Sequence, residues 1–179
     1  DVLENIAVVA AGRRRFVLFP PDQIANLYVG PIEFTPAGQP VSMVDLERPD
    51  FTRFPRFAEA LKHARTAVLE PGDAVYIPST WWHHVEGLES LNILINHWWL
   101  PVPYYLGAPL DALLHAILSI RELPAAQRKS WRVFFDHYIF NADEQLASHI
   151  PEGRRGVLDP LDENSARKIR SLLRNKLNK

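Results

Sequence analysis

The sequence predicts a mainly β fold with helices at its C-terminal end. Up to about residue 106, short apolar or β-branched runs alternate with turn residues, and beyond it the apolar residues recur with a helical period. A chain of 179 residues with 47% hydrophobic content is long enough for one domain with a sizeable core. We therefore predict a barrel or sandwich at residues 1–106 and a helical extension at residues 107–179.

The expected strands lie at residues 6–11, 15–19, 67–69, 74–77, 83–86 and 91–98. Gly12 separates the first two runs, which reads as a hairpin that ends at Pro20-Pro21. Pro71-Gly72-Asp73 predicts a tight turn between the third and fourth runs. Short strands at this spacing are typical of a barrel or sandwich.

Residues 22–65 show no sustained period, and we interpret them as a long ordered excursion with a short helix near residues 57–63. Two amphipathic helices are expected around residues 110–118 and 131–139. A third is expected to begin at Asp159-Pro160, an N-cap residue followed by proline. These helices either cover the β domain or form a homodimer interface.

Composition excludes several classes of function. The formal net charge of −1 gives no global field that would recruit nucleic acid or an anionic membrane. The absence of cysteine excludes disulfides and thiolate metal sites and fits a reducing compartment, so we expect a cytoplasmic protein. No apolar run is long enough to span a membrane, and the first residue is not Met. We expect a soluble chain that begins inside a longer protein.

The segment from Ile77 to Glu86 carries the clearest chemical signal, because two adjacent histidines follow two tryptophans after a proline turn. A carboxylate and imidazoles from neighbouring strands can bind Fe(II) on one face and leave positions open. Asp1 is the candidate carboxylate, and either His83 or His84 is the candidate imidazole, since alternation sends the two histidines to opposite faces. The competing interpretation is that both histidines are structural.

Several blocks, in order from Asp1 to about Trp99, resemble one known family. They are Asp-x-x-x-Asn-Ile-Ala, Ala-Gly-Arg-Arg-Arg-Phe-x-Leu-Phe-Pro-Pro-Asp-Gln, Val-Asp-Leu-Glu-x-Pro-Asp, Arg-Phe-Pro, Pro-Gly-Asp-Ala-x-Tyr-Ile-Pro, Trp-Trp-His-His-Val-Glu and Asn-His-Trp-Trp. Together they look like the cupin-like JmjC-type dioxygenases, which include protein asparaginyl hydroxylases.

The resemblance implies a double-stranded β-helix, or jelly roll, that binds Fe(II) and the cosubstrate 2-oxoglutarate. By position, Asp1 matches the aspartate of the family's His-x-Asp pair, and His83 matches its distal iron ligand. The proximal histidine would lie two residues before Asp1 and is not in this sequence. The resemblance therefore also implies that the first strands of the jelly roll precede this chain.

Four further residues match cosubstrate positions of the family. Arg14 corresponds to the basic residue that pairs with the distal carboxylate of 2-oxoglutarate, and alternation places it on one strand face with Phe16 and Leu18. Asn5 and Asn96 correspond to asparagines near the cosubstrate, and Trp98 to an aromatic residue at the same end of the site.

The implied function is Fe(II)- and 2-oxoglutarate-dependent hydroxylation of a protein side chain or a small molecule. The implied partners are that substrate and a second copy of the chain, without nucleic acid or membrane. One alternative is a cupin-type binding module that has lost the iron triad and catalyses nothing. Another is a metal-dependent sugar isomerase of the same architecture, which the inward arginine and the Trp-Trp-His-His block make less suitable.

Overall fold

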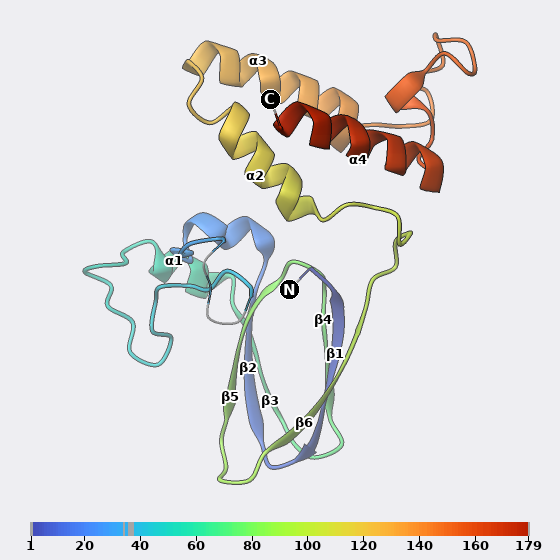
Figure 1. The fold of residues 1–179 in the computed structure, drawn as a ribbon. Coiled ribbons are helices and arrows are strands. Elements are labelled where there is room, and N and C mark those ends of the chain that lie inside the picture. The colour runs from blue at the N-terminus through green and yellow to red at the C-terminus, as the bar shows by residue number, and fades with distance from the viewer. Residues whose placement is uncertain (1, 34, 36–37, 179) are drawn as a thin grey trace. The chain divides into compact units, whose positions relative to one another are not determined.

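The structure, a computed structural model, describes residues 2–33, 35 and 38–178. The chain forms two compact units, Asp1–Pro101 and Val102–Lys179, each of which is described by itself (Figure 1). Strands occupy the first unit and helices dominate the second, so the mainly β architecture with C-terminal helices is confirmed.

Two three-stranded antiparallel sheets build the first unit. One has the order β4-β1-β6 and the other the order β3-β2-β5, and they lie opposite one another (Figure 1). The strands of the first sheet are β1 (Glu4–Ala11), β4 (Ala74–Ile77) and β6 (Ile93–Trp99). The strands of the second are β2 (Arg14–Phe19), β3 (Arg65–Leu69) and β5 (Trp82–Gly87).

The predicted hairpin between the first two strands is wrong. β1 pairs with β4 and β6, whereas β2 pairs with β3 and β5, so the turn at Gly12 carries the chain from one sheet to the other. Gly12 has φ +69°, and a Cβ atom there would lie 2.2 Å from the carbonyl oxygen of Leu91. Only glycine fits both the positive φ and the close approach of the Leu91 carbonyl. Glycine is also common in hairpin turns, so its presence in the sequence did not distinguish a hairpin within one sheet from a crossing between two sheets.

The predicted tight turn between β3 and β4 is present. The amide of Asp73 donates to the carbonyl oxygen of Glu70 at 3.0 Å, and the Asp73 carboxylate accepts from the Glu70 amide at 2.9 Å. Gly72 supplies the positive φ of 96° that this turn requires.

Apolar side chains from both sheets meet between them. Ala7 and Val9 of β1 are fully buried, and Phe16 of β2 is 1% exposed. The cluster is completed by Leu18, Leu69 and Ile77. Alternation along β1 and β2 follows from this packing, because every second residue points between the sheets.

The excursion between β2 and β3 has a core of its own. It contains the 3-10 helix η1 (Pro21–Ala25), a β-bridge between Val29 and Ser42, and the short helix α1 (Phe57–Lys62). Its buried residues are Phe19, Leu27, Val44, Phe57 and Ala60. The sequence thus predicted α1 but not η1.

The second unit contains three α-helices: α2 (Pro109–Ser119), α3 (Ala125–Phe135) and α4 (Glu163–Leu177). A π-helical turn, η2 (Asp136–Phe140), continues α3, and a 3-10 turn, η3 (Gly156–Leu158), precedes α4. Within the described part of the chain, no helix is both long and apolar enough to cross a bilayer.

The predicted start of the third helix is wrong by a few residues. Asp162, not Asp159, is the N-cap of α4, because its carboxylate accepts from the amide of Ser165 at 2.6 Å. The Ser165 hydroxyl accepts from the Asp162 amide at 2.8 Å, which completes a capping box. Both aspartates are N-cap residue types, and only the reciprocal serine three positions later favours Asp162.

The Asp162 cap makes the helicity of α4 dependent on pH. Hydrogen bonds from Ser165 lower the pKa of the Asp162 carboxyl, so its stabilising effect is present above the unfolded-state pKa and is lost as the pH falls through the folded-state pKa. We expect Asp162→Ala to reduce the helicity of α4 at neutral pH and to remove this acid dependence, as measured by amide hydrogen exchange. Asp159→Ala is the control, and an equal effect there would contradict this capping assignment.

Candidate functional site

His83 and Arg14 lie on the same inner face of the β3-β2-β5 sheet. Leu18 of β2 pairs with His83 of β5, and Arg14 of β2 pairs with Gly87 of β5. Directly opposed residues in an antiparallel pair share a face, so His83 joins the buried Leu18 between the sheets. Arg14 and Leu18 are four residues apart, which puts their backbone positions about 13 Å from one another.

The local environment of His83 favours its neutral form. Burial lowers the pKa of the imidazole, and Nδ1 lies 3.2 Å from the carbonyl oxygen of Trp81. When Nδ1 carries the proton and donates it to that carbonyl, Nε2 carries the lone pair. A backbone carbonyl in this role is a common support for a metal-binding histidine. His84 pairs with Val17 and lies on the opposite face.

The three consecutive arginines differ sharply in their surroundings. Arg13 forms an ion pair with Glu89 at 2.7 Å, and Arg15 forms one with Glu86 at 3.0 Å. Arg14, between them, points toward the inner face, and its Nε is buried without a hydrogen-bond partner. Its register neighbour is Gly87, where a Cβ atom would lie 3.1 Å from Asn92 Nδ2, so the Asn92 side chain occupies the space at that glycine.

The other three predicted site residues lie on the inner face of the β4-β1-β6 sheet. Asn5 of β1 pairs with Trp98 of β6, and Ala7, two residues later, pairs with Asn96. Asn5 is 4% exposed, Asn96 is half-buried, and Trp98 is 49% exposed. The structure therefore places Asn5, Asn96 and Trp98 together on one sheet and His83 and Arg14 together on the other.

Buried polar atoms without partners are concentrated at these positions. In the described part of the chain, the buried side-chain nitrogen and oxygen atoms that lack a hydrogen bond are Asn5 Oδ1, Arg14 Nε and Asn92 Oδ1. Burying a polar group without a partner costs about 1–3 kcal/mol, so such atoms are uncommon in proteins. Two of the three belong to predicted cosubstrate residues. Arg14 Nε is a donor and fits an anionic ligand, whereas Asn5 Oδ1 is an acceptor and fits a donor such as water.

Asp1, the predicted carboxylate ligand, lies outside the described residues. Its chain neighbour Val2 accepts a hydrogen bond from the Ser79 hydroxyl at 2.9 Å, and the Ser79 amide donates to Glu4 at 3.1 Å. Ser79 precedes Thr80, whose φ of 66° turns the chain toward β5 and His83. Hydrogen bonds thus connect the start of β1 to the turn that precedes the candidate histidine.

A complete metal site needs several ligand side chains that converge on one point. Across residues 2–33, 35 and 38–178, no three His, Asp or Glu side chains converge as a metal site. His83 is the candidate ligand that the structure describes, and its neutral, carbonyl-supported imidazole suits iron or another borderline metal.

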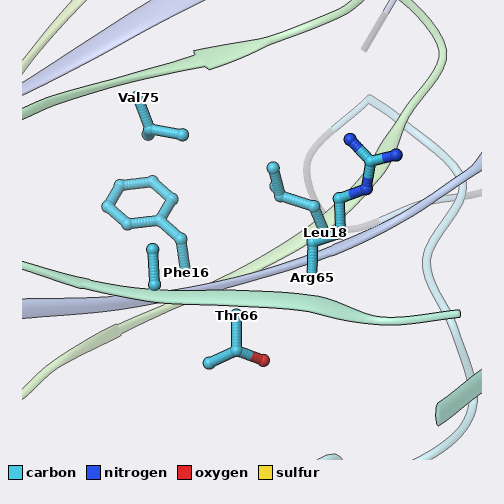
Figure 2. A pocket seen from close by; sticks show the side chains of 6 residues that line it. Phe16, Leu18, Arg65, Thr66 and Val75 are labelled. Carbon is cyan, nitrogen blue, oxygen red and sulfur yellow. The ribbon is translucent and has the colours of Figure 1, made fainter. Parts of the chain in front are cut away.

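A small cavity lies beside this inner face and was not predicted from the sequence. Its volume is about 200 Å³, and its lining is Phe16, Leu18, Arg65, Thr66, Ala67 and Val75. Figure 2 shows the Arg65 side chain on the same side of its strand as Phe16, Leu18 and Val75, with Thr66 directed the other way. Arg65 begins a strand that the sequence pattern placed two residues later, so its face was not assigned.

Comparisons with known proteins agree with the motif resemblance. A model of the cupin-like domain family matches residues 1–105. HSPB1-associated protein 1 of Homo sapiens is 36% identical over 94 residues, which are 52% of this chain and 19% of that protein. Lysine-specific demethylase JMJ31 of Arabidopsis thaliana is 36% identical over 99 residues, 55% of this chain and 18% of the relative.

A third relative, tRNA wybutosine-synthesizing protein 5 of Gallus gallus, is 32% identical over 103 residues, 58% of this chain and 29% of the relative. The chain thus spans less than a third of the length of each of these relatives. The family match covers more than half of the chain and includes every strand of both sheets. The chain belongs to the cupin-like domain family of JmjC type.

Proposed function

We propose that this chain forms part of an Fe(II)- and 2-oxoglutarate-dependent dioxygenase that hydroxylates a protein side chain or a small molecule. The observation that carries the proposal is the pair of unsatisfied polar atoms, Asn5 Oδ1 and Arg14 Nε, buried on the inner faces that also hold His83. A relative named as a demethylase supports an enzymatic role.

In this proposal, Asp1 and His83 would hold iron, together with a third ligand for which the family pattern has a histidine two residues before the position of Asp1. When bound, iron and 2-oxoglutarate supply the activation of dioxygen, in which 2-oxoglutarate becomes succinate and carbon dioxide and the substrate gains a hydroxyl group. The two sheets would close as a double-stranded β-helix once strands are added at the open edges of β5 and β6.

The chain's own residues bind and orient in this scheme. The Arg14 guanidinium pairs with the distal carboxylate of 2-oxoglutarate, because a planar fork of N–H donors matches a carboxylate. Asn5 and Asn96 donate or accept hydrogen bonds near the metal-binding end, and Trp98 covers that end with an apolar ring. Neutral His83, supported by the Trp81 carbonyl, offers Nε2 to iron. Phe16 and Leu18 exclude water between the two anchors.

The proposal is tested by anaerobic titration of the full-length protein with Fe(II) and 2-oxoglutarate while the visible metal-to-ligand charge-transfer band is recorded. We expect a band in the wild type and none in His83→Ala, because the alanine removes an iron ligand. His84→Ala is the matched control and should keep the band, since its side chain lies on the outer face. A folded wild-type protein without a band would favour a non-catalytic binding module.

Asn5 gives a test that separates function from folding. Asn5→Leu removes an unpaired buried acceptor, so we expect the free energy of unfolding to stay unchanged or to rise by about 1 kcal/mol. The affinity for 2-oxoglutarate should fall about tenfold or more, because the substitution also removes the Asn5 amide N–H donor that would bind a carboxylate oxygen of the cosubstrate. Chemical denaturation and the charge-transfer titration measure the two effects.

Gln23→Leu is the matched control for this substitution. Gln23 is 6% exposed and, unlike Asn5 Oδ1, its amide oxygen accepts a hydrogen bond from Asn26 at 2.9 Å. We expect it to lose stability and to keep its affinity for 2-oxoglutarate. A stability loss in Asn5→Leu with unchanged cosubstrate affinity would show that Asn5 has only a structural role.

We also propose that the second unit joins a second copy of the chain. Its helices expose large apolar side chains, among which Leu118 of α2 is 75% exposed and Phe140 of η2 is 73% exposed. Patches of this kind mark protein interfaces, and a two-fold dimer uses the same patch on both copies. We expect Leu118→Lys with Phe140→Lys to give monomers in sedimentation velocity. Ile24→Lys, in the first unit, should leave the dimer intact, and a monomeric wild type would contradict the proposal.

A further inference from the structure

Arg65 is a second cation on the inner face that carries His83. Leu18 of β2 pairs with Arg65 on one side and with His83 on the other, so the three residues form one row across the sheet. Two interstrand spacings separate Arg65 from His83, which puts their Cα atoms about 10 Å apart. Arg65 therefore lies in the same cross-strand row as the candidate metal-binding residue, with Leu18 between them, and at the other end of β2 from Arg14.

The Arg65 guanidinium is held by an aromatic ring and not by an acid. It lies over the Trp81 ring at 5.0 Å from the centroid. Among the residues that the structure describes, no carboxylate forms an ion pair with Arg65, whereas the outward-facing Arg13 and Arg15 each have a glutamate partner. Stacking fixes the plane of a guanidinium and leaves its N–H edge available to an anion.

The size and lining of the cavity beside Arg65 indicate what kind of ligand group could contact this arginine. Apart from the hydroxyl of Thr66, which Figure 2 shows directed away, its lining offers apolar surface from Phe16, Leu18, Ala67 and Val75. At about 200 Å³ it has room for a small substituent and not for a whole large ligand. Arg65 is the charged group in its lining, so an entering group gains most if it is anionic.

We propose that Arg65 is a specificity residue that binds a carboxylate or phosphate of the molecule to be oxidised, so that the substrate of this domain is acidic. The role of Arg65 in substrate binding rests on the proposed oxygenase function. The binding of an anion by Arg65 does not depend on that function. It assigns the two inward arginines different tasks: Arg14 takes the cosubstrate, and Arg65 takes the substrate.

The test records the arginine Nε–Hε and tryptophan indole N–H signals of the isotope-labelled full-length protein by NMR, during separate titrations with inorganic phosphate and with acetate. We expect saturable shifts at Arg65 and Trp81 with at least one probe, and the stronger probe identifies the anion class. The shift should be at least fivefold weaker in Arg65→Lys, which keeps the charge but loses the fork, and absent in Arg65→Gln.

Two controls make the result specific. Arg14→Gln should keep the shift at Arg65, and loss of the shift in that variant would overturn the division of tasks. Arg56 lies over the Tyr28 ring at 4.9 Å in the excursion, so it has the same stacked chemistry away from the inner face. Equal shifts at Arg56 and Arg65, or no saturable shift at Arg65, would overturn the inference.

The charge-transfer titration of Arg65→Gln separates this inference from the proposed function. A normal band together with a lost anion shift supports both. A normal band in a wild type that shows no anion shift overturns the Arg65 inference alone. An anion shift in a wild type that gives no band overturns the oxygenase proposal and leaves Arg65 as the anion site of a binding module.

Discussion

The crossing at Gly12 is the constraint on which the rest of the first unit depends. A side chain there would meet the Leu91 carbonyl oxygen at 2.2 Å, and the φ of +69° is one that glycine adopts without strain. Because the chain crosses between sheets at this point, β1 and β2 become the central strands of opposite sheets. The inner residues of both strands then face the same space, which brings Asn5 and Arg14 into one interior.

The interior between the sheets contains both apolar side chains that stabilise it and polar atoms that destabilise it. Ala7, Val9 and Phe16 remove apolar surface from water and hold the sheets together. Asn5 and Arg14, on the same inner faces, bury polar atoms without partners and weaken the packed state. A fold retains such groups at a cost in stability when a ligand satisfies them, which is why these atoms support a binding site more strongly than the cavity volume does.

The sequence predicted the strand positions well, because alternation along a half-buried strand is a direct consequence of packing. The inward position of Arg14 beside Phe16 and Leu18 followed from that period alone. The connection at Gly12 could not be predicted, since a glycine turn joins strands of one sheet or of two with equal ease. The N-cap of α4 was misplaced because neighbouring aspartates have similar local preferences.

For the candidate site, too, the sequence predicted some residues and missed one. Motif resemblance assigned Asp1, His83, Arg14, Asn5, Asn96 and Trp98, and the structure shows the face on which each of these lies except Asp1, which it does not describe. Arg65 was missed because its role depends on register: only pairing with Leu18 places it in the row of His83. No periodicity within one strand reveals which residue of another strand lies beside it.

We propose that the inner faces of the two sheets enclose one site, with the metal at His83 and the cosubstrate carboxylate at Arg14. A crystal structure of the full-length protein grown anaerobically with Mn(II) and 2-oxoglutarate tests it most directly. We expect an anomalous Mn peak within bonding distance of His83 Nε2 and ligand density that ends on the Arg14 guanidinium. Density for 2-oxoglutarate that ends on Arg65, or a metal peak away from His83, would contradict it.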